Sequence, residues 1–164
     1  MILEAILTLS AVAAVAGVVN LFNNKIENKK VTPMKIKLPG NLPIITLFNN
    51  KKALNFIVDS GSNISHICSE YYDSIESTPI GTYEEGEISG LGATTTGITM
   101  CEAILKDYKN NNYKITLSVS DQLGVVAKNI EDNTGVKIHG LLGTDFLKNY
   151  DCILDFKDYK LHFK

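Results

Sequence analysis

Short hydrophobic runs alternate with polar turns from residue 34 to the C-terminus. An apolar run at 43–48, a polar turn at 49–52 and a second run at 53–58 are typical of a β-hairpin. Further strands are predicted at 98–105, 113–119, 152–156 and 160–163. A turn, a loop and a single short helix are predicted at 107–112, 73–81 and 145–149. Many short strands separated by turns predict an all-β barrel or sandwich.

The N-terminal part of the chain has a different pattern. Residues 5–22 are nearly all apolar and carry no charged side chain, and this is about the length that a membrane-spanning helix needs. A buried helix of a globular domain should have a polar face, but Thr8, Ser10 and Gly17 form no polar stripe. A cleaved signal peptide is the alternative, although the basic residues that usually begin one are missing. The predicted parts are a transmembrane helix or signal segment at 1–24, a linker at 25–33 and a globular domain at 34–164.

The charges around this apolar segment indicate its orientation. Lys25, Lys29 and Lys30 follow it, whereas Glu4 is the only charged side chain before it. Since positive charge is enriched on the cytoplasmic side of transmembrane helices, we expect a single-pass membrane protein with its domain in the cytoplasm. If the segment is instead a cleaved signal peptide, the domain is exported.

Composition and charge exclude several classes of function. The net charge is −2 and no cluster of lysines resembles a nucleic-acid-binding surface, so we expect no nucleic-acid partner. The three cysteines, Cys68, Cys101 and Cys152, form no CxxC pair, which indicates reduced, partly buried thiols. The three histidines have no metal-binding spacing. No metal and no cofactor are predicted.

The segment at 56–62 carries the candidate chemistry. Here an apolar run ends abruptly in Asp59, Ser60 and Gly61. A carboxylate at the end of a buried strand is costly unless it is hydrogen-bonded or used. Gly61 allows a tight turn that brings backbone N–H groups to the carboxylate, and Ser60 can fix the loop by hydrogen bonding. These three are the candidate catalytic residues, although Asp-Ser-Gly alone is also an ordinary strand-ending turn.

A second segment, Gly-Leu-Leu-Gly-Thr-Asp-Phe-Leu at 140–147, precedes the strand at 152–156. The order of an apolar strand, Asp-Ser-Gly, a glycine-bearing hairpin and apolar-apolar-Gly before a short helix and strand resembles the retropepsin family. This family contains the retroviral proteases and their cellular relatives. The resemblance covers about residues 34–164 and implies a closed acid-protease barrel with a flap hairpin and one short C-terminal helix.

The flap in this family is a hairpin that closes over the substrate. Its position here corresponds to 87–94, so the resemblance implies that Ser89, Gly90, Leu91 and Gly92 bind substrate. A plain surface hairpin is the alternative interpretation of this segment.

The resemblance implies an aspartic endopeptidase that hydrolyses peptides or proteins without a cofactor. Its mechanism needs two carboxylates, but the chain has one Asp-Ser-Gly, since Asp145 and Asp155 precede Phe in other contexts. The second Asp59 should therefore come from the partner in a homodimer. Two features depart from the retroviral pattern: Thr144 stands where those enzymes usually have Arg, and the two C-terminal strands look like a self-contained hairpin.

Other functions stay open. The chain could be a non-catalytic retropepsin-like module that binds peptides or mediates assembly, or an unrelated small β-domain. Ser/His/Asp catalysis has no support, because Ser60 and Ser62 have no identifiable base and His66 is too close in sequence. Nucleotide binding has none either, because no helix follows the glycines at 90 and 92.

Overall fold

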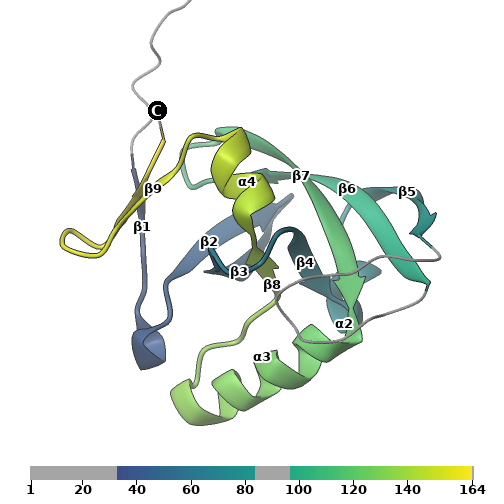
Figure 1. Cartoon of the computed structure of the whole chain (residues 1–164), viewed down its shortest axis with the longest axis horizontal. Helices are drawn as coiled ribbons and strands as arrows, with labels where there is room; N and C mark the ends of the chain where they lie inside the picture. Colours follow the sequence, from purple (N-terminus) through teal and green to yellow (C-terminus); the bar gives the residue numbers. More distant parts are fainter. Residues whose placement is uncertain (1–32, 84–96, 164) are drawn as a thin grey trace, which may run out of the picture. The chain divides into compact units, whose positions relative to one another are not determined.

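The computed structural model describes residues 33–83 and 97–163 (Figure 1). The segment expected to be an anchor, 1–24, and the expected flap residues, Ser89, Gly90, Leu91 and Gly92, lie outside the described residues. Among the helices of the described part, none is long and apolar enough to cross a membrane. The strands are β1 (Met34–Lys35), β2 (Ile44–Asn49), β3 (Lys52–Val58), β4 (Ser65–Cys68), β5 (Ser77–Tyr83), β6 (Ile98–Lys106), β7 (Asn112–Ser120), β8 (Gly140–Leu142), β9 (Ile153–Asp155) and β10 (Lys160–His162).

Six strands form a closed barrel in the order β2-β3-β8-β4-β7-β6. The circle closes where Phe48 of β2 lies opposite Lys106 of β6, and β5 extends the sheet beyond β6. The predicted hairpins β2–β3 and β6–β7 are antiparallel and are confirmed. Two pairs, β3–β8 and β4–β7, are parallel and join segments that are far apart in the sequence. The predicted all-β closed barrel is therefore correct in its strands.

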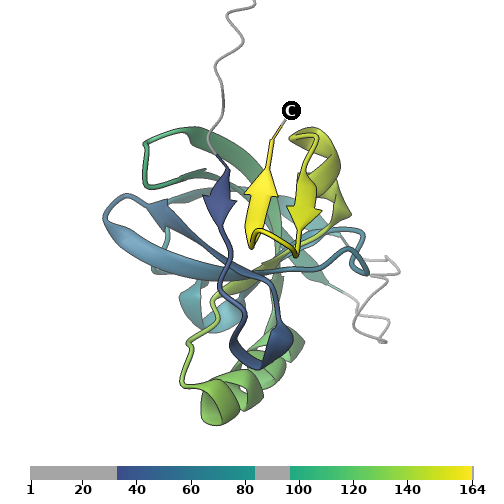
Figure 2. The same cartoon turned by 90° about the vertical axis from the view of Figure 1, so that its left-hand side faces the viewer.

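A separate three-stranded sheet has the order β1-β10-β9. Figure 2 shows it facing the viewer, with β10 between its two neighbours. The antiparallel β9–β10 pair is the self-contained C-terminal hairpin that the sequence predicts. Met34 and Leu161 of this sheet belong to the same hydrophobic core as the barrel.

The helices differ from the prediction of a single short one. The predicted C-terminal helix is present as α4 (Thr144–Asn149), but α2 (Ser69–Tyr72), the 3₁₀ turn η1 (Pro39–Asn41) and the 14-residue α3 (Asp121–Thr134) were not expected. The prediction of a loop at 73–81 is also wrong, because β5 begins at Ser77 and pairs with β6.

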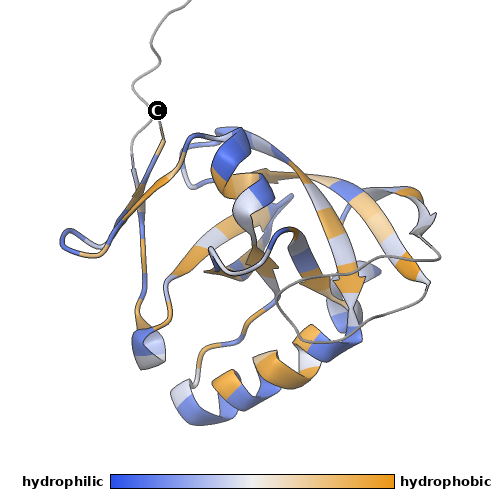
Figure 3. Ribbon diagram, in the orientation of Figure 1, coloured by the Kyte–Doolittle hydropathy of each residue, from blue (hydrophilic) through white to orange (hydrophobic). Residues whose placement is uncertain are grey.

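The core follows the two-residue repeat of the strands. In β7, Tyr113, Ile115 and Leu117 are buried, whereas Lys114 and Thr116 between them are exposed. The same alternation of hydrophobic and hydrophilic positions is visible along β6 and β7 in Figure 3. Since successive side chains of a strand point to opposite faces, the buried set marks the interior of the barrel.

Candidate active site

Asp59 lies directly after β3, on the loop that leads to β4. Its backbone N–H donates to the Leu142 carbonyl oxygen at 2.9 Å, which continues the parallel β3–β8 pairing by one residue. Its side chain is partly exposed, whereas Ile57 and Val58 before it are buried. The barrel thus delivers an acidic side chain from a buried strand to the surface.

The turn after Asp59 depends on Gly61. The Gly61 N–H donates to Asp59 Oδ1 at 2.8 Å, and a Cβ at Gly61 would lie 3.1 Å from the same oxygen. The small residue therefore lets the backbone amide approach the carboxylate. Ser60 does not have the expected role of fixing the loop by hydrogen bonding. It is exposed, and its hydroxyl makes no hydrogen bond to any of the described residues.

Ser62, rather than Ser60, fixes the loop. Its carbonyl oxygen accepts hydrogen bonds from the Thr144 N–H at 2.8 Å and from Thr144 Oγ1 at 3.1 Å. Its own hydroxyl donates to the Ile64 carbonyl oxygen at 2.7 Å. Thr144 stands where the retroviral pattern has Arg, so a neutral hydroxyl and a backbone amide here join the Asp59 loop to the start of α4.

Close packing of backbones holds the same junction together. A Cβ at Gly143 would lie 2.5 Å from the Ile64 carbonyl oxygen and 2.9 Å from that of Ser62. These contacts are too short for any side chain, so glycine is the residue that allows the Asp59 loop to lie against the end of β8.

Asp145 is used inside the protein. Its carboxylate accepts hydrogen bonds from the Ser65 hydroxyl at 2.7 Å, the Ser65 N–H at 3.0 Å and the Phe146 N–H at 2.7 Å. The Ser65 hydroxyl in turn accepts from the Gly143 N–H at 3.0 Å. Asp145 therefore connects β4, β8 and α4 and is not free to act as a second catalytic acid.

Asp155 belongs to the three-stranded sheet. It accepts from the backbone N–H groups of Asp158 and Lys157 at 3.0 and 2.9 Å, and lies 3.4 Å from His162 Nε2. The hydrogen bond from Asp158, followed by those from Lys157 and His162, lowers the pKa of this carboxyl group. Asp155 thus stabilises the β9–β10 turn, which agrees with its exclusion as a catalytic acid from the sequence.

His66 of β4 is a neighbour of the loop that the sequence did not identify as part of the site. Its side chain is buried, and its Nε2 lies 3.4 Å from Ser62 Oγ. Burial lowers the pKa of His66, and the charges of Asp145 and Asp59 oppose this shift. The imidazole lies next to Ser62 rather than Ser60, and the Ser62 hydroxyl already donates to the Ile64 carbonyl oxygen, so this geometry gives no support to a Ser/His pair acting on Ser60. The sequence contains one signal that could identify His66, because a polar His between Ser65 and Ile67 is unusual in a short buried strand.

The three cysteines are unpaired, as the sequence predicts. Cys68, Cys101 and Cys152 are free, and burial raises the pKa of Cys68 and Cys152 to about 12. Within residues 33–83 and 97–163, no group of three His, Cys, Asp or Glu side chains is placed to hold a metal ion.

Of the comparisons with known proteins, the comparison with solved structures finds a match. No protein-family model and no curated protein sequence matches the chain. Among solved structures, the chain is similar to the EIAV protease complexed with the inhibitor HBY-793. The sequence identity is 19%, the match covers 66% of this chain and 88% of that one, and the TM-score is 0.46. A likeness at this level carries no information on activity. The evidence on function is therefore the geometry of the Asp59 loop.

Proposed function

We propose that the chain is an aspartic endopeptidase that works as a homodimer, with one Asp59 from each subunit in a shared site. The observation that carries this proposal is the setting of Asp59. A buried strand ends in a partly exposed carboxylate, and a loop braced by Thr144 and Gly143 holds it in place. Among the described residues, the only hydrogen bond to this carboxylate comes from the Gly61 N–H. Most of its hydrogen-bonding capacity is thus left for water or substrate.

A single acid is not enough for this chemistry. Two carboxylates about 3 Å apart cannot both ionise, so they share a proton. The ionised one takes a proton from a bound water, which attacks the scissile carbonyl carbon. The protonated one donates a hydrogen bond to the carbonyl oxygen, and a proton is then delivered to the leaving amine. No covalent enzyme intermediate and no cofactor are needed.

The structural roles of Asp145 and Asp155 support the need for a second subunit. The Asp145 carboxylate accepts three hydrogen bonds between β4 and α4, and Asp155 closes a turn in the other sheet. A partner related by a twofold axis supplies an identical Asp59 loop.

Replacing Asp59 tests the proposal. Asp59→Asn keeps the shape of the side chain but removes the shared-proton chemistry, so peptide cleavage by the full chain should be lost while circular dichroism is unchanged. The matched control is Asp132→Asn, because Asp132 is an exposed acid on α3 that forms an ion pair with Lys128 and should leave cleavage intact. Equal cleavage by Asp59→Asn and the wild type would contradict the proposal. Peptide binding without cleavage by the wild type would favour the non-catalytic module.

The apolar segment at 5–22 supports a related proposal, that the chain is a single-pass membrane protein with its domain in the cytoplasm. The full chain should then stay with membranes after carbonate extraction, and protease added to sealed cells should not reach the domain. Release by carbonate would contradict a spanning helix. N-terminal sequencing that finds cleavage near Ala16 would instead favour the signal peptide and export.

A further inference from the structure

Two buried polar atoms on neighbouring strands have no hydrogen-bond partner among the described residues. They are His66 Nδ1 on β4 and Ser118 Oγ on β7. The two side chains are 1% and 0% exposed, and the residues lie opposite each other in the parallel β4–β7 pair. A buried polar group without a partner costs free energy, so two that are neighbours indicate a missing hydrogen-bonding group.

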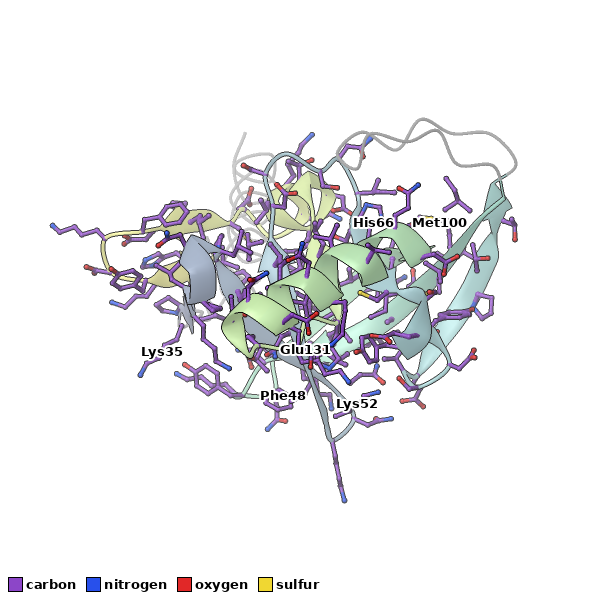
Figure 4. The ribbon with its side chains drawn as sticks, turned by 90° about the horizontal axis from the view of Figure 1, so that it is seen from below. Lys35, Phe48, Lys52, His66, Met100 and Glu131 are labelled. Atoms are coloured by element: carbon purple, nitrogen blue, oxygen red, sulfur yellow. The ribbon has the colours of Figure 1, made fainter. Side chains whose placement is uncertain are left out.

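Strand alternation shows which face the pair occupies. Ile67 and Leu117, the sequence neighbours of the pair, belong to the barrel core. His66 and Ser118 therefore point to the face of the sheet opposite to that of Ile67 and Leu117. Met100 of β6 lies opposite Ser118 and continues this face, and Figure 4 labels His66 and Met100 near one another on the same side of the domain.

The same face includes the candidate catalytic acid. Leu141 of β8 is paired with His66 on one side and with Ile57 of β3 on the other. Asp59 follows Ile57 by two residues, so it leaves the sheet on the face that carries Leu141 and His66. The charge of Asp59 also acts on the His66 imidazole, which supports their proximity.

Hydrogen bonding defines what the missing group must do. Because the Ser62 hydroxyl donates to the Ile64 carbonyl oxygen, it can only accept from His66, so His66 Nε2 carries the proton. His66 Nδ1 is then an acceptor without a donor, and the Ser118 hydroxyl is a donor without an acceptor. One group that both donates and accepts would satisfy both atoms.

We propose that His66 and Ser118 form a recognition site for a short, uncharged substrate side chain close to the scissile bond, namely the hydroxyl of Ser or Thr or the carboxamide of Asn. The inference rests on the proposed function, because it assigns this side chain to the peptide cut at Asp59. A carboxylate would place its lone pairs against His66 Nδ1, and an ammonium group would bury a charge without a counterion. An apolar side chain would leave both atoms without partners.

Matched peptides test this recognition. The full chain in detergent micelles is first given a peptide library, and cleaved sequences are identified by mass spectrometry. Peptides are then made with Thr or its isostere Val at each position near the cleaved bond. At one position the wild type should cleave the Thr peptide roughly tenfold faster in kcat/KM, because a site built for a hydroxyl rejects the analogue that lacks it. Ser118→Ala and His66→Leu should each bring this ratio close to one.

A control variant and a binding measurement separate the possible outcomes. Thr116→Val alters an exposed residue of the same strand, β7, and should keep the Thr preference. Unchanged ratios in both Ser118→Ala and His66→Leu would overturn the inference while the proposed function stands, since the pair would then hold only a buried water.

The same library is also used to select peptides that bind the Asp59→Asn chain. A Thr preference in binding that Ser118→Ala removes, together with no cleavage by the wild type, would support recognition by the pair and overturn the peptidase. Neither binding nor cleavage of any peptide would overturn both.

Discussion

At the residue scale, small residues and short hydrogen bonds hold the Asp59 loop in position. Gly143 leaves room for the backbone of Ile64, Thr144 holds the Ser62 carbonyl oxygen, and Gly61 presents its N–H to the acid. Packing at this junction therefore controls both the stability of the barrel and the geometry of the acid.

Gly143→Ala tests that packing. The added Cβ would overlap the Ile64 carbonyl group, which is backbone and cannot rotate away, so the free energy of unfolding should fall by about 1–3 kcal/mol. Gly124→Ala is the matched control, because no atom lies within 4 Å of its added Cβ on α3. That control should raise stability by about 0.5–1 kcal/mol. Urea unfolding measures both, and equal stability of Gly143→Ala and the wild type would contradict this account of the junction.

Asp145→Asn separates a structural acid from a catalytic one. An amide can replace one accepting oxygen, but its NH₂ group then faces a donor on Ser65 or Phe146. The free energy of unfolding should fall by about 1–3 kcal/mol, and cleavage should persist at temperatures where the variant is folded. Complete loss of cleavage in a folded Asp145→Asn chain would instead place Asp145 in the chemistry.

His139 gives the domain a predictable pH dependence. Burial, followed by the charges of Lys137 and Lys52, lowers its pKa, and its Nδ1 accepts a hydrogen bond from the Asn55 N–H at 3.0 Å. Since the folded-state pKa lies below the unfolded value of about 6.5, unfolding takes up a proton in the interval between them. Stability is therefore complete above about pH 6.5 and is lost as the pH falls through the folded-state pKa. The pKa of the buried His66 is lowered as well and adds to this loss.

Urea unfolding at pH 7.5 and 5 should show this loss, and His139→Gln should reduce it, because glutamine keeps an acceptor for Asn55 without titrating. NMR titration of the imidazole provides the direct measurement. A folded-state pKa of His139 at or above 6.5 would contradict the prediction.

At the element scale, the sequence predicts features that depend on neighbours along the chain. The β2–β3 and β6–β7 hairpins follow from polar turns between apolar runs, and α4 follows a Gly-Thr-Asp start. The β3–β8 and β4–β7 pairs are different, because they join distant segments and nothing local in the sequence specifies them. The local patterns predict a barrel and a sandwich equally well. The prediction of a closed barrel comes from the resemblance to a known family.

The elements that were missed have weak local signals. α3 contains Gly124, two adjacent valines and two asparagines, all residues of low helix propensity. The sequence nevertheless marks both ends of this helix, since Ser120 caps its start and Gly135 ends it with a φ of 69°. β5 was missed because Pro79 and Gly81 read as a loop, and the pairing with β6 is irregular between them. Asp59 is identifiable as the candidate acid because it follows a predicted strand, whereas His66 lies on β4, a strand of four residues with no clear boundary in the sequence.

The cap of α3 provides a prediction at this scale. The Ser120 hydroxyl accepts a hydrogen bond from the Leu123 N–H at 3.1 Å, and its loss in Ser120→Ala should lower stability by about 1 kcal/mol. Ser120→Asp is the matched control, because aspartate also caps helices and should retain most of the stability. If thermal unfolding shows that both variants are equally destabilised, crowding at the end of β7 rather than capping determines the effect.

At the scale of the whole molecule, the proposed chemistry needs more catalytic acids than one chain offers. The mechanism needs two carboxylates in one site, whereas Asp145 and Asp155 are engaged in structural hydrogen bonds. A second copy of the Asp59 loop resolves this. Activity should then depend on the concentration of dimers, and a membrane anchor would favour pairing by raising the effective concentration of chains.

The last prediction is that the activity of one chain depends on the identity of its partner. Specific activity should fall on dilution, in parallel with the loss of dimers measured by sedimentation. Adding an equal amount of Asp59→Asn chain and allowing subunits to exchange should make about a quarter of the dimers wild type. Because the total number of dimers doubles, the activity should fall to about half of that of the wild type alone. The same addition measured before exchange should have no effect, which controls for simple inhibition. Full specific activity in a chain shown to be monomeric, or an activity unaffected by exchange with Asp59→Asn, would place the second acid within the same chain.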